Sequence, residues 1–222
     1  MWVRSCAACR RRSVFVTSRR ERERDEFRER VLGAAVAIAH AEGWANVSMR
    51  RIAEAIEYTA PALYHHFENK DAVVAALRQR GYRLLLQRFE RIRSADPVDR
   101  LNAMARHHVD FAFEHPELFN AMYGLGGMSC ESPDAPIEAQ LVAGIVHSSA
   151  RPVFEGDGGA RPGFDDEIDA LWASLHGIVS MALGGPVEGG RTRARSLSAL
   201  TLTNTLTAWS STMRASASKQ RR

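Results

Sequence analysis

Residues 48–67 read SMRRIAEAIEYTAPALYHHF, and this stretch decides the fold. It opens with Ser48, a residue type whose hydroxyl caps helix N-termini by accepting a backbone hydrogen bond. An apolar stripe at helical spacing follows and consists of Met49, Ile52, Ala53 and Ile56. The pattern predicts a short helix over residues 49–56.

A second short helix is expected directly after a turn at Glu57-Tyr58. Thr59 supplies the next N-cap, and Pro61 falls in the first turn, where its missing N–H costs nothing. The predicted helix spans residues 59–66.

A longer helix is expected ahead of this pair, over residues 24–42. Its apolar face consists of Phe27, Val31, Ala34, Ala35 and Ile38, and Gly43 follows as a C-cap. One long helix and two short helices joined by a tight turn form a helix-turn-helix unit. Such a unit leaves the N-terminus of its last helix exposed, where a recognition helix meets base edges.

The remaining chain reads as helices separated by Gly- and Pro-rich loops, with no strand pattern. The expected helices span residues 70–93, 97–114, 116–123, 137–151, 166–183 and 193–213, with loops at 124–133 and 152–163. The fold class is therefore all-α, an N-terminal helix-turn-helix domain followed by a helical bundle. The expected division is a basic disordered tail (1–23), a DNA-binding domain (24–71), a ligand-binding and dimerisation domain (72–214) and a disordered tail (215–222).

The charge of the chain is unevenly distributed. The formal net charge is +4, but residues 1–24 alone carry +6, so a polyanion such as nucleic acid is the first partner to consider. The sequence has no apolar run long enough to span a bilayer and no secretory signal. Cys6 and Cys9 have metal-pair spacing without a second pair, and three sparse cysteines fit a reducing cytoplasm.

Several short matches link the N-terminal third to a known family. They are Arg30-Val31-Leu32, Ala34-Ala35, Glu42-Gly43, Ser48-Met49-Arg50-Arg51-Ile52-Ala53, Pro61-Ala62-Leu63-Tyr64-His65-His66-Phe67 and Asn69-Lys70-Asp71. In their order and spacing, residues 24–71 resemble the TetR family of bacterial transcription regulators. One departure is Glu57, which stands where the family has a glycine that takes positive φ; a side chain there costs about 1 kcal/mol or more.

The resemblance implies a set of DNA-contacting residues: Ser48, Arg50, Ala60, Pro61, Ala62, Tyr64, His65, His66 and Lys70. Arg50 would contact a base edge or phosphate, and Tyr64 a phosphate; the alternatives are a solvated arginine and a core tyrosine. Lys70 adds its charge to a helix N-terminus, which suits a phosphate. A His65-His66 metal pair is not expected, because adjacent helical residues point about 100° apart.

The C-terminal half resembles a TetR subgroup with a Trp-His-Gly signature, here Trp172, His176 and Gly177. The resemblance implies an effector-binding and dimerisation domain. The candidate pocket residues are Met104, His108, Phe111, Phe119, Met122, Tyr123, Trp172 and His176. The alternative is purely structural, with Trp172 and His176 fixing the packing and Gly177 permitting a close approach.

No catalytic motif, metal site or cofactor site is expected. The cluster of acidic residues at 165–169 lies at a helix N-terminus, where carboxylates complement the helix dipole. The expected protein is a cytoplasmic, homodimeric, ligand-responsive repressor that binds a near-palindromic operator on double-stranded DNA. It would dimerise through helices near 166–184 and 193–213. The alternatives are a sequence-tolerant DNA binder driven by the tail, and a helical-bundle enzyme or ligand-binding protein without an operator.

Overall fold

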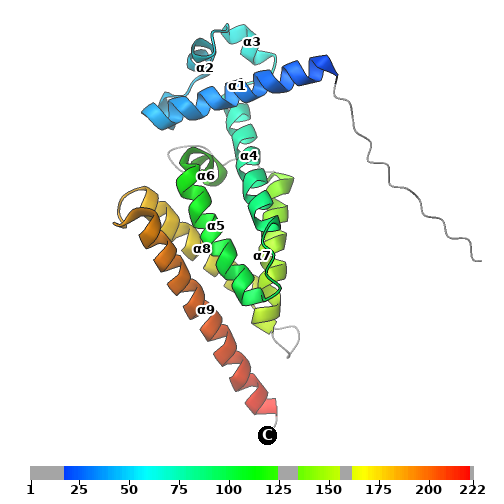
Figure 1. The fold of residues 1–222 in the computed structure, drawn as a ribbon, viewed down its shortest axis with the longest axis vertical. Coiled ribbons are helices and arrows are strands. Elements are labelled where there is room, and N and C mark those ends of the chain that lie inside the picture. Colours follow the sequence, from blue (N-terminus) through cyan, green and yellow to red (C-terminus); the bar gives the residue numbers. More distant parts are fainter. Residues whose placement is uncertain (1–17, 125–134, 156–161, 221–222) are drawn as a thin grey trace, which may run out of the picture.

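The computed structural model describes residues 18–124, 135–155 and 162–220, and the regular structure in these ranges is entirely helical (Figure 1). The elements are α1 (Arg19–Glu42), η1 (Trp44–Asn46), α2 (Met49–Ala55), α3 (Ala60–Tyr64), α4 (Lys70–Glu90), α5 (Pro97–Glu114), α6 (Pro116–Tyr123), α7 (Ile137–Glu155), α8 (Phe164–Leu183) and α9 (Gly190–Gln220). Helices α1–α3 form one end of the molecule, and α5–α9 form the larger body below it (Figure 1). The predicted all-α class and its two-part architecture are confirmed.

Helix α1 begins at Arg19, five residues before its predicted start. The reason is a capping box: the Ser18 hydroxyl accepts from the backbone N–H of Glu21 at 3.2 Å, and the Glu21 carboxylate accepts from the N–H of Ser18 at 2.7 Å. The last residues of the predicted basic tail therefore belong to a helix. Residues 1–17 of that tail lie outside the described residues.

The predicted ends of two later helices are also wrong. Helix α7 runs through Pro152 to Glu155, although a proline cannot donate a helical hydrogen bond. Phe154 is buried against Phe164 and Trp209, with ring centroids 5.2 and 5.3 Å away, so tertiary packing offsets the lost bond. Helix α9 begins at Gly190 and continues to Gln220, into the predicted disordered tail.

Helix α4 joins the two parts of the molecule (Figure 1). One continuous side of it is buried, and the apolar members of that side are Val73, Val74, Leu77, Leu85, Leu86 and Phe89. Asn69 caps the helix as predicted, accepting from the N–H of Ala72 at 2.9 Å. The buried side contacts α1 near its start and α5, α6 and α7 further along.

The closest approach along this seam involves a glycine. A Cβ atom built on Gly81 would lie 2.5 Å from the sulfur of Met122 and 3.5 Å from Cβ of Leu118. The backbone of α4 is therefore in direct contact with side chains of α6. Gly81 itself is buried. By contrast, Gly33 lies exposed in the interior of α1, and a Cβ there would meet no atom within 4 Å.

These two helical glycines should respond to alanine in opposite directions. Gly81→Ala should lower the free energy of unfolding by about 1–2 kcal/mol, because Met122 must move out of an overpacked site. Gly33→Ala should raise it by about 0.5–1 kcal/mol, because alanine restricts the unfolded chain without a clash. Urea titration measures both, and a stabilised Gly81→Ala would contradict the packing of α4 on α6.

Candidate nucleic-acid interface and effector cavity

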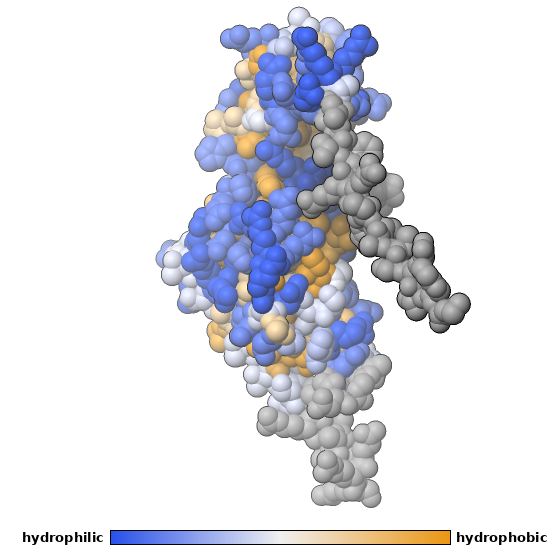
Figure 2. Space-filling model, turned by 45° about the vertical axis from the view of Figure 1, so that its right-hand side comes forward, coloured by the Kyte–Doolittle hydropathy of each residue, from blue (hydrophilic) through white to orange (hydrophobic). Residues whose placement is uncertain are grey.

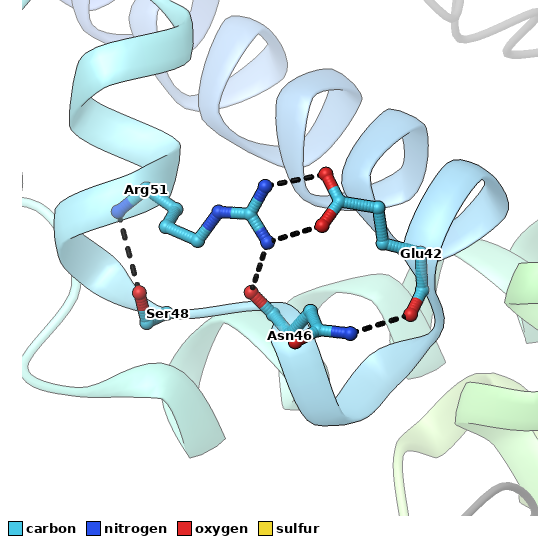
Figure 3. Close-up of polar contacts among 4 residues, drawn as sticks. All are labelled: Glu42, Asn46, Ser48 and Arg51. Carbon is cyan, nitrogen blue, oxygen red and sulfur yellow. Dashed lines mark hydrogen bonds and ion pairs between the residues drawn. The ribbon is translucent and has the colours of Figure 1, made fainter.

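Helix α2 is fixed to the end of α1 by Arg51 (Figure 3). Its guanidinium holds both carboxylate oxygens of Glu42, one at 2.7 Å, and donates to the carbonyl oxygen of Asn46 at 3.1 Å. The hydrogen bond from Arg51 holds the pKa of Glu42 below its ordinary value. Ser48 caps α2 by accepting from the N–H of Arg51 at 3.3 Å, as its sequence position predicted.

The turn between α2 and α3 contains the strained residue that the sequence indicated. Glu57 has a φ of 59°, the only positive φ outside glycine in the described chain. The backbone N–H of Tyr58 closes the turn on the carbonyl of Ala53 at 2.9 Å. Thr59 occupies the N-cap position of α3, but its side chain makes no capping hydrogen bond, so that part of the prediction is wrong.

A second anchor holds the far end of α3 against α1. Arg28 donates to the carbonyl oxygen of His66 at 2.8 Å and lies over the ring of Phe67 at 4.2 Å. The His66 ring packs on Phe27, with centroids 4.4 Å apart, and burial and then Arg28 lower its pKa. His66 therefore supports the unit from behind, and α3 ends before it, at Tyr64.

What remains outward on α2 and α3 is a small face of mixed chemistry. Figure 2 shows this end of the molecule as largely hydrophilic with scattered apolar side chains. Tyr64 is 54% exposed, so the alternative that it is a core tyrosine is wrong. Pro61 and His65 are exposed beside it. The Arg50 side chain is 85% exposed and pairs with Glu54 of its own helix at 2.8 Å. Such an exposed pair is worth little, so Arg50 can exchange Glu54 for another anion.

Among the other predicted DNA contacts, two are alanines with small side chains, and the third is a lysine whose ammonium already makes a hydrogen bond within the protein. Ala60 and Ala62 are half-buried at the start of α3. Lys70 is half-buried, and its ammonium donates to the carbonyl oxygen of Trp44 at 2.8 Å. One of its three donors thus ties α4 to η1, so Lys70 is less open to a phosphate than its position at a helix N-terminus indicated.

The strain at Glu57 can be measured with two substitutions. Glu57→Gly should raise the free energy of unfolding by about 1 kcal/mol, because glycine adopts positive φ without the steric penalty of a Cβ. Glu57→Ala removes the same carboxylate but keeps the Cβ, so it should bring no such gain. Thermal and urea unfolding test the pair; equal effects of the two variants would show that the backbone is unstrained.

The C-terminal body contains a cavity of about 190 Å³ between α4, α6, α7 and α8. Its wall consists of Tyr82, Tyr123, Ala139, Val142, Ala143, Val146, His147, Ile168, Asp169 and Trp172. Tyr123 and Trp172 were predicted pocket residues, and the others were missed. The α7 members carried a signal, because the apolar residues of that helix repeat at helical spacing. A narrower hollow next to it is lined by Met104 and shares Trp172.

A cluster of aromatic and polar side chains lies behind this wall. The His176 ring lies 3.9 Å from that of Tyr123 and stacks on Phe119 at 4.8 Å. His108 is fully buried, 4.8 Å from the ring of Trp172 and 6.0 Å from that of His176. Both nitrogens of His108, Nδ1 of His176 and the hydroxyl of Tyr123 are buried without a hydrogen-bond partner. Orphaned polar atoms of this kind are costly and rare.

Six of the eight predicted pocket residues lie outside the cavity wall: Met104 in the adjacent hollow, His108, Phe119 and His176 in the cluster behind the wall, and Phe111 and Met122 in neither place. Phe111 packs against His115, at 5.3 Å between centroids, under the guanidinium of Arg88. Met122 fills the space over Gly81. The close approach proposed for Gly177 is also absent among the described residues, because a Cβ there would meet no atom of a neighbouring helix within 4 Å.

Burial keeps the polar cluster uncharged. It lowers the pKa of His108 to about 3, with a smaller contribution from His176, and it lowers the pKa of His176 itself. Burial, assisted by the neighbouring Tyr82, raises the pKa of Tyr123. At neutral pH the cluster therefore offers neutral imidazole rings and a protonated phenol.

One ion pair links the cavity wall to α4. Glu138, buried in the first turn of α7, accepts from Gln79 at 3.1 Å and from Arg83 at 3.2 Å, both on α4. The pKa of Glu138 is lowered by hydrogen bonds, despite the opposing effect of burial. Glu138 precedes the wall residue Ala139, and Arg83 follows the wall residue Tyr82. The ion pair therefore lies between the cavity wall and α4, the helix that carries the N-terminal unit.

The buried histidine predicts a specific pH dependence. His108 has a depressed pKa in the folded state, so its contribution to stability is present above pH 6.5 and is lost as the pH falls toward 3. The loss should be about 1.4 kcal/mol per pH unit below 6.5, since the unfolded chain takes up a proton that the folded chain does not.

The matched substitution is His108→Leu. It should raise the free energy of unfolding by about 1–3 kcal/mol at neutral pH by removing two orphaned nitrogens, and it should flatten the acid slope. His107→Leu, on the next residue, should keep the slope. Urea titrations between pH 5 and 7.5 measure both the free energy of unfolding at neutral pH and its slope with pH. An unchanged slope in His108→Leu would contradict the assignment.

The described residues contain no group of three or more His, Cys, Asp or Glu side chains placed to hold a metal ion. None of their helices is long and apolar enough to cross a membrane.

A helix-turn-helix unit joined to a helical body with a cavity is the architecture of transcription regulators that carry a DNA-binding part and a ligand-binding part on the same polypeptide. Comparison with known proteins points to the same class. The family model "Bacterial regulatory proteins, tetR family" matches residues 31–77, and "Tetracyclin repressor-like, C-terminal domain" matches residues 101–203. The chain therefore belongs to the TetR family. Members of this family are transcriptional regulators and not enzymes, as the sequence led us to expect.

The individual relatives are distant. The uncharacterized HTH-type transcriptional regulator YobS of Bacillus subtilis (strain 168) is 29% identical over 92 residues, 41% of this chain and 48% of that protein. The match thus spans about half of its length. The structure of the TetR family regulator PfmR from Thermus thermophilus has a TM-score of 0.60 at 20% identity, over 78% of this chain and 97% of that one. Thermus thermophilus FadR, solved with lauroyl-CoA, gives 0.55 at 16% identity, over 79% and 93%. These structures support the fold.

Proposed function

We propose that this protein is a homodimeric, ligand-responsive transcriptional repressor that binds a near-palindromic operator in the cytoplasm. The observation that carries the proposal is the outward face of α2 and α3. The opposite side of these helices is held to α1 by hydrogen bonds, so the outward side chains are not needed to fix the unit. Arg51 and Arg28 fix the two helices to α1 from behind. Arg50, Tyr64 and His65 are left exposed in front.

The chemistry of this face fits a major groove. A guanidinium such as that of Arg50 can hold a guanine bidentately, and an exposed phenol such as Tyr64 can donate to a phosphate. Ala60, Pro61 and Ala62 are small enough to bring the backbone of α3 close to the bases and to touch thymine methyl groups. Sequence preference should therefore depend mainly on Arg50 and His65.

Dimerisation is proposed through α8 and α9. Met181 and Leu200 are 56% and 57% exposed, one on each helix, and these helices pack on each other at the edge of the body. A two-fold axis there would present two copies of α3 to successive half-sites. The Trp-His-Gly subgroup assignment belongs to the same proposal and rests on Trp172, His176 and Gly177.

Effector control is proposed to act through α4. A ligand in the cavity contacts Tyr82 on α4 and Ala139 on α7, on either side of the Glu138 ion pair. If the ligand fits one position of α4 better than another, it shifts the spacing of the two DNA-binding units. Without such a difference in affinity there is no allostery.

Selection of DNA with the purified full chain tests the proposal. Random or fragmented genomic DNA is recovered at about 150 mM salt, where sequence-independent electrostatic binding is weakened, and sequenced. A partly palindromic motif supports the dimeric operator binder. Recovery without a motif favours binding driven by the basic N-terminus, and deletion of residues 1–17 should then remove most of the affinity. No recovery would contradict DNA binding.

Arg50→Ala should weaken binding to the selected motif by about 1–3 kcal/mol and relax the preference at one base position, because a bidentate contact is lost. The control is Arg106→Ala, which removes the same charge from an exposed arginine on α5, in the C-terminal body. Footprint titrations at fixed salt give both affinities. An unchanged affinity of Arg50→Ala would refute the assignment of Arg50.

A further inference from the structure

We infer that the effector is a small, neutral, planar aromatic molecule that carries a hydroxyl or carbonyl group. The inference rests on the proposed function, because it identifies the cavity in the C-terminal body as the effector site. It follows from four properties of that cavity: its volume, its aromatic walls, its unsatisfied polar atoms and its charge.

The volume limits the ligand to about one ring system. The cavity measures about 190 Å³. A cavity of about 150 Å³ accommodates benzene, whereas sites for drug-sized ligands usually span about 300–1,000 Å³. The cavity therefore can enclose a monocyclic or small bicyclic molecule but not a long acyl chain.

The walls favour a flat aromatic shape. Three aromatic side chains converge from three helices: Tyr82 of α4, Tyr123 of α6 and Trp172 of α8. Aromatic rings interact favourably in offset-stacked and edge-to-face arrangements, as Tyr82 and Tyr123 already do at 5.9 Å. The α7 side of the wall is aliphatic from Ala139 to Val146 and ends at the imidazole ring of His147.

The buried polar atoms beside the cavity favour a ligand ring that carries one hydrogen-bonding group. The hydroxyl of Tyr123 is buried and makes no well-formed hydrogen bond, although the neighbouring phenol of Tyr82 is close enough to help raise its pKa. Behind it lies His176, whose Nδ1 is orphaned. The hydroxyl of Tyr82 donates to the carbonyl oxygen of Met122 at 3.4 Å. A ligand hydroxyl or carbonyl that meets Tyr123 satisfies a group already removed from water, so the gain is not offset by new desolvation of the protein.

The residue types of the lining disfavour anions. The lining holds no lysine or arginine, and it includes the carboxylate of Asp169. His147 lies 3.8 Å from a second carboxylate, that of Asp165. A carboxylate ligand would therefore lose its hydration without gaining a cationic partner.

Calorimetry on the full chain without DNA tests the inference with four probes. Phenol has the ring and the hydroxyl, toluene has only the ring, benzoate adds a charge, and dodecanoate is a long acyl anion. Phenol should bind best, toluene about tenfold more weakly, and benzoate and dodecanoate not measurably at concentrations up to about 10 mM.

Two variants assign the binding to this cavity. Tyr123→Phe should weaken phenol binding about tenfold and leave toluene binding unchanged, because it removes only the hydrogen bond. Its control, Tyr58→Phe, removes a hydroxyl from the N-terminal unit and should change neither. Ala143 lies at the open side of the cavity wall, so Ala143→Leu should narrow the cavity and weaken binding of both probes. Its control, Ala75→Leu, enlarges an exposed side chain of α4 that does not line the cavity and should weaken neither. Thermal melts confirm that each variant is folded.

Three outcomes would overturn the inference: benzoate or dodecanoate binding more tightly than phenol, no response to phenol at about 10 mM, or the same response in Ala143→Leu. The assay contains no DNA, so these outcomes leave operator binding to be judged by the DNA selection alone. Conversely, phenol can bind the cavity of a chain that selects no motif, which would sustain the ligand class while refuting the repressor.

Discussion

The burial of one side of α4 is the constraint on which the rest of the molecule depends. The start of this side packs with α1 and its later part with α5, α6 and α7, so neither half of the chain completes its core without the helix. Gly81 allows α6 to approach closely, and Glu138 ties α7 to the same helix. A helix buried at both ends is a rigid link, and this is what a coupling between cavity and DNA-binding unit requires.

Two features that lower the stability of the fold, a strained backbone residue and a cluster of unpaired buried polar atoms, lie at the places where function is proposed. Glu57 holds a positive φ in the turn that aims α3, and the cluster around His108 keeps several polar atoms unpaired beside the cavity. Strain and orphaned polar groups persist only where the surrounding structure enforces them, and natural proteins concentrate them at functional sites. Three further buried polar atoms without a hydrogen bond, on Trp44, Ser180 and Ser198, lie outside these two places.

Local signals account for the parts that the sequence predicted well. The Ser48 and Asn69 caps, Pro61 in the first turn of α3 and the strained φ of Glu57 all depend on neighbouring residues, and the structure contains each. The predicted ends of α1, α7 and α9 failed for a different reason. The capping box at Ser18 was overlooked although it is local, whereas the passage of α7 through Pro152 depends on Phe154 packing against distant aromatic rings.

The helical class, the helix-turn-helix unit and its family can be read from the amino-acid sequence, because helix periodicity, caps and turn residues act over a few positions. Which side chains meet depends on how the helices pack. This packing separated Phe111 and Met122 from the cavity, joined Tyr82 to Tyr123 and Trp172, directed Lys70 to a backbone carbonyl and left His108 without partners. These contacts join residues far apart along the chain, and their geometry is set by how whole helices pack, which no local pattern encodes.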